Sequence, residues 1–130
     1  METNLKNAKV FVTGAANGIG RDTALGFSRE GAHVVLIDID AGGLAEIADA
    51  IAAEGGQSSI VEADLATGEG VILAIKSALD ATDGSVDVLV NNVGSGAVRT
   101  FDELSDEHWD NTMSLNFMSY VRTCREVLPV

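Results

Sequence analysis

The sequence predicts an α/β fold, a doubly wound parallel sheet with helices on both faces. Short apolar runs typical of buried strands alternate with longer segments that carry apolar residues at helical spacing. A glycine-rich turn at residues 13–20 joins the first run to the first helical segment. Four strand–helix units follow one another without a linker, which is too few for an eight-unit barrel.

The predicted strands are short and rich in β-branched and aliphatic residues. The run at 33–38 is almost continuously apolar, as in a parallel strand covered on both faces. The strands are expected at residues 9–13, 33–38, 58–62 and 86–91. Right-handed crossovers would place them in the order 3-2-1-4, a Rossmann-like sheet that ends after four strands.

The predicted helices carry start and stop signals. Asp40, Thr67 and Ser105 each precede a helical pattern and are good N-cap residues. Gly31 stands where a helix end favours a positive φ. The helices are expected at residues 18–30, 41–54, 68–82 and 106–127.

Composition and charge limit the possible partners. The 130 residues suit a single domain, 1–130, and carry 20 acidic against 8 basic residues, a net charge of −12. This charge argues against nucleic acid and anionic membrane surfaces. No apolar run reaches the ~18 residues of a membrane span, and no signal-peptide core is visible. With the single Cys124, these features predict a cytoplasmic protein.

The glycine turn predicts a phosphate site. Gly14 would let the chain leave the first strand sharply, Gly18 would let the backbone approach a pyrophosphate, and Gly20 would let the helix pack closely. The helix start offers free N–H groups to an anion. No Lys-Ser/Thr pair follows the turn, which excludes a P-loop. A purely structural strand-to-helix turn is the alternative.

Asp38 predicts which dinucleotide binds. It ends the second strand, 24 residues after Gly14, where an acid accepts hydrogen bonds from an adenosine ribose. Its carboxylate would repel a 2′-phosphate, and so we expect NAD rather than NADP. The alternative is a solvated acid at a strand end.

Five features in order make the chain resemble the short-chain dehydrogenase/reductase family. These are Thr13-Gly-Ala-Ala-Asn-Gly-Ile-Gly20, Asp64-Leu65 after the third strand, Asn91-Asn92-Val93-Gly94 after the fourth, Trp109 with Asn116 in the last helix, and Leu128-Pro129. The resemblance covers nearly the whole chain. It implies an NAD-dependent oxidoreductase that transfers a hydride between an alcohol and a ketone.

The resemblance also implies roles for single residues. Asn17, Gly18 and Ile19 would face the pyrophosphate, and Asp64 and Leu65 would meet the adenine. Asn91 would brace the fourth strand against Thr13, while Asn92, Val93 and Gly94 would line the middle of the cofactor. Asn116 would be the helix asparagine whose kinked backbone holds a water of the proton relay. A hydrogen-bonded amide in helix packing is the alternative for Asn116.

The sequence departs from the family pattern in two places. Val93 stands where the family usually has alanine. The family's catalytic Ser and Tyr-x-x-x-Lys are absent, since Tyr120 is followed four residues later by Cys124. We therefore expect the chain alone to bind NAD without turnover, as the N-terminal half of such an enzyme. A non-catalytic dinucleotide-binding module or regulator, or a protein–protein module with an empty cleft, stays open.

Two further expectations follow. His33 and His108 have no metal-ligand spacing, and so no metal site is expected. The fourth strand would lie at a bare apolar edge of the sheet, and the last helix would have an uncovered apolar face. We therefore expect a homo-oligomer through that edge or that helix.

Overall fold

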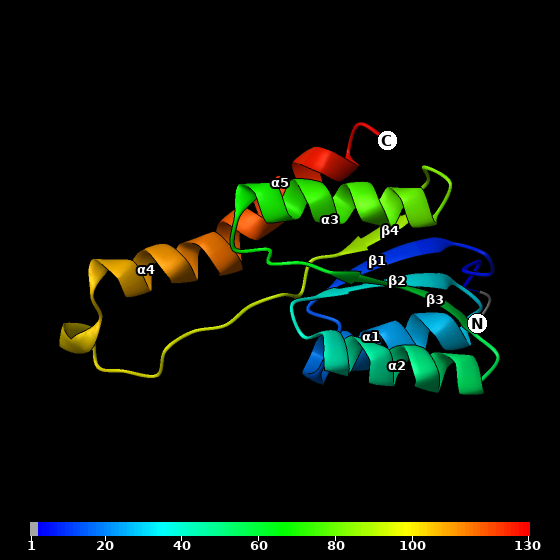
Figure 1. Ribbon diagram of the computed structural model, residues 1–130, viewed down its shortest axis with the longest axis horizontal. Helices are drawn as coiled ribbons and strands as arrows, with labels where there is room; N and C mark the ends of the chain where they lie inside the picture. The colour runs from blue at the N-terminus through cyan, green and yellow to red at the C-terminus, as the bar shows by residue number, and fades with distance from the viewer. Residues whose placement is uncertain (1–2) are drawn as a thin grey trace.

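A computed structural model describes residues 3–130 and contains one four-stranded sheet. The order is β3-β2-β1-β4, and every neighbouring pair is parallel (Figure 1). The strands are β1 (Lys9–Thr13), β2 (His33–Asp38), β3 (Gln57–Glu62) and β4 (Val88–Val90). The predicted fold class and strand order are confirmed.

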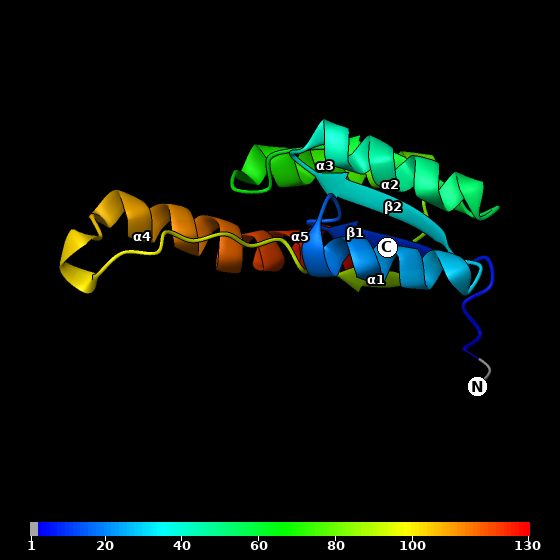
Figure 2. The ribbon, with the colours of Figure 1, turned by 90° about the horizontal axis from the view of Figure 1, so that it is seen from below.

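The helices cover both faces of this sheet. Helices α1 and α2 pack on one face, and α3 with α5 packs on the other (Figure 1). Their bounds are α1 (Gly18–Arg29), α2 (Ala41–Ala53), α3 (Gly68–Ala81), α4 (Asp106–Met113) and α5 (Ser119–Val127). Helix α4 and the loop before it extend away from the sheet in both views (Figures 1 and 2).

The core forms two layers, because successive strand residues point to opposite faces. Val10 and Leu36 pack with α1 and α2, whereas Phe11 and Ile37 pack with α3. All four side chains are fully buried. Burial on both faces explains why β2 is an almost uninterrupted apolar run.

The predicted helix signals are present. Asp40 Oδ1 accepts a hydrogen bond from Gly43 N at 3.1 Å, and Thr67 Oγ1 accepts one from Gly70 N at 3.0 Å. Ser105 Oγ accepts a longer one from His108 N at 3.4 Å. Gly31 has a φ of +85°, the left-handed conformation expected after α1.

The segment expected as one helix at residues 106–127 is distorted around Asn116, where the resemblance implies a kinked backbone. A π-helical turn (Ser114–Met118) separates α4 from α5. Within this turn, Asn116 Nδ2 donates to Thr112 O at 2.9 Å and thereby competes for a helix carbonyl. A short 3₁₀ helix (Phe101–Glu103) also precedes α4.

The fourth strand is shorter than expected, because the parallel register with β1 covers only Val88–Val90. Just before it, Asp87 N donates to Lys9 O at 2.8 Å, and Asp87 Oδ2 accepts a hydrogen bond from Lys9 N at 2.7 Å. Among residues 3–130, no helix is long and apolar enough to cross a membrane.

Candidate functional site

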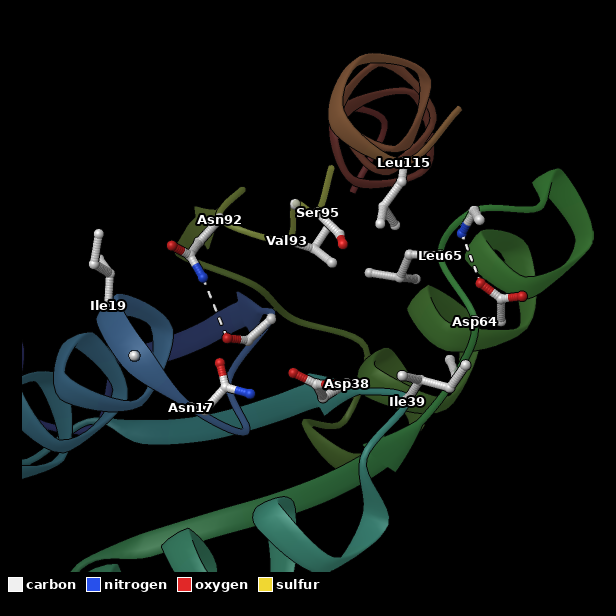
Figure 3. Close-up of a pocket in the computed structure, with 15 residues that line it drawn as sticks. Asn17, Ile19, Asp38, Ile39, Asp64, Leu65, Asn92, Val93, Ser95 and Leu115 are labelled. Atoms are coloured by element: carbon white, nitrogen blue, oxygen red, sulfur yellow. Dashed lines mark hydrogen bonds between the residues drawn. The ribbon is translucent and has the colours of Figure 1, made fainter. Parts of the chain in front are cut away.

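A cavity of about 500 Å³ lies at the carboxyl ends of the strands. This is the edge where open parallel sheets bind ligands. The glycine turn, the ends of β2 and β4, the loop after β3 and Leu115 surround it (Figure 3).

Backbone atoms come very close to two glycines of the turn, Gly14 and Gly20. Gly14 has a φ of +67°, and a Cβ built on it would lie 2.9 Å from Val93 Cα. A Cβ at Gly20 would overlap the carbonyl oxygen of Gly14. Neither position has room for a side chain, so the sharp exit from β1 at Gly14 and the close packing of α1 at Gly20 both require glycine.

The start of α1 is open to an anion. Gly18 has a φ of +54° and no atom within 4 Å of its missing Cβ, so a ligand can approach the backbone there. The N-cap Asn17 makes no side-chain capping bond, and the first turn of α1 contains no acidic residue. The first N–H groups of α1 and the positive end of its dipole are therefore available to a phosphate.

The carboxylate of Asp38 is fixed at the cavity wall. Its Oδ2 accepts a hydrogen bond from Ala16 N at 3.0 Å, and its Oδ1 accepts one from Asp40 N at 3.1 Å. These bonds tie the end of β2 to the glycine turn and still leave each oxygen a lone pair for a ligand hydroxyl. Across the wall, Asp64 Oδ1 accepts from Ala66 N at 2.9 Å, which shapes the loop after β3 (Figure 3).

Asn92, not Asn91, braces β4 against β1. Asn92 N donates to Thr13 Oγ1 at 2.9 Å, and its Nδ2 donates to Thr13 O at 3.1 Å. The side chain of Asn91 turns toward α5, where its Oδ1 accepts from Thr123 Oγ1 at 2.6 Å. The expectation for Asn91 is wrong in this respect, because neighbouring side chains on a strand point to opposite faces.

Asn116 connects the π-helical turn to the loop after β4. Its Oδ1 accepts from Ser95 N at 3.0 Å, and its Nδ2 donates to Ser95 O at 2.6 Å. The amide is thus satisfied by backbone partners, and the helix backbone is distorted at this position. This pairing fixes Ser95 beside Leu115 at the rim of the cavity.

The structure brings most of the predicted site together. Ten predicted residues line the cavity: Gly14, Asn17, Gly18, Ile19, Asp38, Asp64, Leu65, Asn92, Val93 and Gly94. Gly20, Asn91 and Asn116 lie outside the wall. The wall also contains five residues that the sequence did not indicate: Ile39, Ala63, Ala66, Ser95 and Leu115.

The sequence carries a signal for Ile39, an apolar residue directly after the strand-ending Asp38. In the structure its side chain is 65% exposed at the cavity wall. Leu115 carried none, because only the packing of the distant π-helical turn brings it to the cavity.

The wall fits a dinucleotide better than a metal ion. Glycine backbone at a helix start suits a pyrophosphate, and Ile39 with Leu65 offers apolar surface for a planar base. Within residues 3–130, no group of three or more His, Cys, Asp or Glu residues is placed to hold a metal.

Comparison with known proteins agrees with this geometry. The short chain dehydrogenase family model matches residues 8–130. A probable galactose dehydrogenase of Rhizobium meliloti is 35% identical over 127 residues, which are 97% of this chain and 49% of that protein. A probable oxidoreductase of Mycobacterium tuberculosis is 40% identical over 116 residues, 89% of this chain and 19% of that protein.

Solved structures of similar proteins have the same fold as this chain. An L-sorbose reductase from Gluconobacter frateurii, complexed with NADPH and L-sorbose, superposes with a TM-score of 0.93 at 35% identity. The match covers 99% of this chain and 49% of that one. A Burkholderia phymatum short chain dehydrogenase/reductase in complex with NAD gives a TM-score of 0.91 at 32% identity, covering 97% and 44%. The chain thus spans about half the length of most of these relatives.

Proposed function

The chain belongs to the short-chain dehydrogenase family, and from this premise we propose that it is the cofactor-binding part of an NAD-dependent oxidoreductase. When bound, the nicotinamide would supply hydride transfer to or from the carbon of an alcohol or ketone. The residues of this chain would bind and orient the dinucleotide. Asn17, Gly18 and Ile19 at the start of α1 would hold the pyrophosphate, and Asp64 with Leu65 would meet the adenine.

The observation that carries the choice of NAD is the carboxylate of Asp38. It lies at the cavity wall, held by Ala16 N and Asp40 N. The residues that line the cavity include Asp38 and Asp64 but no Lys, Arg or His. A 2′-phosphate on the ribose would meet negative charge without a compensating base, whereas a ribose hydroxyl can donate to the carboxylate. The two related structures above contain different cofactors, NADPH and NAD.

Calorimetric titration of the chain with NAD and with NADP tests this proposal. We expect NAD to bind at least about tenfold more tightly, since like-charge juxtaposition costs several kcal/mol. Equal affinity for NADP would refute the choice of NAD. Binding of neither dinucleotide would favour a protein–protein module with an empty cleft.

The chain itself would bind cofactor without turnover. Tyr120, its only tyrosine, lies half-buried in α5, and Cys124 rather than lysine follows it by four residues. Asn116 would support the proton relay of the whole enzyme from the π-helical turn. Oxidation of alcohols by the 130-residue chain, followed by NADH absorbance, would contradict this statement.

A further inference from the structure

Side chains on both faces hold the cavity wall at residues 91–94. The parallel register of β4 with β1 ends at Val90, directly before this segment. The side chain of Asn92 is bonded toward β1, and that of Asn91 is bonded toward α5. Because the two residues are adjacent, a rotation of one about the chain axis also moves the other. The partners on both faces therefore set the position of the segment together.

Helix α5 holds one face through two consecutive side chains. Thr123 Oγ1 donates to Asn91 Oδ1 at 2.6 Å, and Asn91 Nδ2 donates to Cys124 Sγ at 3.4 Å. Thr123 is fully buried. Both ends of the Asn91 amide thus have partners on α5, and the loss of a partner in a buried place is costly.

The hydroxyl of Thr123 carries one proton, and the distances favour its donation to Asn91. Threonine in a helix commonly turns its hydroxyl to a carbonyl about one turn earlier. For Thr123 this carbonyl is Tyr120 O, at 3.1 Å, whereas Asn91 Oδ1 lies at 2.6 Å. The shorter bond joins α5 to a residue 32 positions earlier in the chain.

On the other face, Asn92 connects the segment to the glycine turn. Its Nδ2 donates to Thr13 O at 3.1 Å and to Gly14 O at 3.2 Å (Figure 3). A Cβ built on Gly20 would lie 2.6 Å from the same nitrogen. A displacement of Asn92 would therefore disturb the turn that leads into the start of α1.

We propose that Thr123 is a positioning residue for the dinucleotide. Its bond to Asn91 fixes the rotation of residues 91–94 and thereby the contacts of Asn92 with the glycine turn. This inference rests on the proposed function. Thr123 does not line the cavity, and so it acts through Asn91. Without this bond the wall would have to be ordered when the dinucleotide binds, which lowers affinity.

Thr123→Val tests the bond, because it removes the hydroxyl and nearly keeps the shape of the side chain. Calorimetric titration with NAD should show an affinity lower by roughly three- to tenfold, the effect of one hydrogen bond. Thr123→Ser keeps the hydroxyl and should bind NAD as tightly as the wild type does.

Thr82→Val is the matched control for stability. Thr82 is 2% exposed at the end of α3, and its hydroxyl donates to Ser85 O at 2.6 Å. It lies outside the cavity wall. Both valine variants lose a buried hydroxyl with a short hydrogen bond, so urea denaturation should show similar losses of stability. Only Thr123→Val should weaken NAD binding.

Asn91→Ala tests whether Thr123 acts through Asn91. This variant alone should weaken NAD binding by a factor similar to that of Thr123→Val, and it replaces that variant if the valine protein does not fold. When both substitutions are combined, Thr123→Val should cause no further loss, because its partner is already absent.

Amide resonances of the chain without ligand give a second readout that does not depend on NAD. In ¹⁵N–¹H spectra, the resonances of Asn92, Val93 and Gly94 should shift in Thr123→Val. They should keep their wild-type positions in Thr82→Val.

The outcomes separate this inference from the proposed function. Wild-type affinity in Thr123→Val, no recovery in Thr123→Ser, or an equal loss of affinity in Thr82→Val would each overturn the role of Thr123. A second full loss in the combined variant would also overturn it. If the wild-type chain binds no dinucleotide, the proposed function falls, and unchanged resonances in Thr123→Val would then refute the positioning of the wall as well.

Discussion

Asn92 joins the ends of β4 and β1 through Thr13. The hydroxyl of Thr13 accepts hydrogen bonds from Asn92 N at 2.9 Å and from Val93 N at 3.1 Å, and it donates to Val90 O at 3.3 Å. In addition, Nδ2 of the Asn92 side chain donates a hydrogen bond to Thr13 O at 3.1 Å. One buried hydroxyl thus sets the position of the chain where it leaves the sheet and enters the cavity wall.

Thr13→Val should decrease the free energy of unfolding by about 1–3 kcal/mol, because it leaves backbone N–H groups of Asn92 and Val93 without their acceptor. Urea denaturation measures this loss. Thr23→Val on α1 is the control, since the Thr23 side chain makes no hydrogen bond within residues 3–130. It should change stability by no more than about 0.5 kcal/mol. Equal effects of the two substitutions would contradict the role assigned to Thr13.

Substitution by alanine should have opposite effects on stability at two glycines of α1, Gly20 and Gly26. Gly20→Ala places a Cβ against the Gly14 carbonyl and should destabilise the fold by about 1–3 kcal/mol. It should also disturb NAD binding, since it moves the glycine turn. Gly26→Ala meets no atom within 4 Å and should stabilise α1 by roughly 0.5–1 kcal/mol. Thermal unfolding of both variants tests the pair, and a stable Gly20→Ala protein with normal NAD affinity would refute the close packing.

Asp38→Asn should reduce the preference for NAD. Loss of the charge weakens the bond to the ribose and removes the repulsion of a 2′-phosphate, so the ratio of NAD to NADP affinity should fall about tenfold. Asp40→Ser is the matched control, because it removes a neighbouring carboxylate but keeps an N-cap side chain. Calorimetric titration measures both ratios. An unchanged ratio in Asp38→Asn would mean that another group selects the cofactor.

The buried His33 should make the free energy of unfolding depend on pH. Burial, with a smaller contribution from the charge of Lys9, holds the pKa of His33 below its ordinary value. As the pH falls, the unfolded chain binds this proton before the folded chain does. The free energy of unfolding should therefore be greatest above about pH 6.5 and should decrease below it.

Urea denaturation on either side of that pH, for the wild type and for His33→Gln, measures this effect. The variant should lose the part of the decrease that arises from His33. A variant with the full wild-type decrease would assign it to other groups.

Self-association stays a prediction of the sequence, and the structure shows where to test it. Phe101, Trp109, Met113 and Phe117 are all exposed large apolar side chains on or beside the helices after residue 100. Within residues 3–130, β4 pairs only with β1 and leaves its other edge open. An interface at these helices would be weakened by a charge.

Phe117→Lys should weaken such an association about tenfold or more, as expected for a central aromatic residue. Ile72→Lys on α3 is the matched control, because Ile72 is 53% exposed and Phe117 54%. Sedimentation equilibrium measures both constants. A wild-type chain that stays monomeric at the highest concentration tested would refute the interface, and an effect of neither variant would point to the β4 edge.

The sequence by itself determined the order of strands and helices, the caps at Asp40 and Thr67, the left-handed Gly31, and ten residues of the cavity wall. These features depend on local patterns, such as apolar periodicity, backbone conformation and side-chain bonds to nearby N–H groups. Such patterns are complete within a few neighbouring residues.

Only the tertiary structure decided which of Asn91 and Asn92 braces Thr13, that the distortion at Asn116 is a π-helical turn, and that Leu115 reaches the cavity. Each of these depends on contacts between residues far apart in the chain, such as Asn116 with Ser95 and Asn91 with Thr123. The direction of a strand's side chains and the energy of a distorted helical turn are set by the partners that the fold supplies. The two adjacent asparagines cannot be told apart from the sequence. In the fold, Asn92 lines the cavity and Asn91 points toward α5.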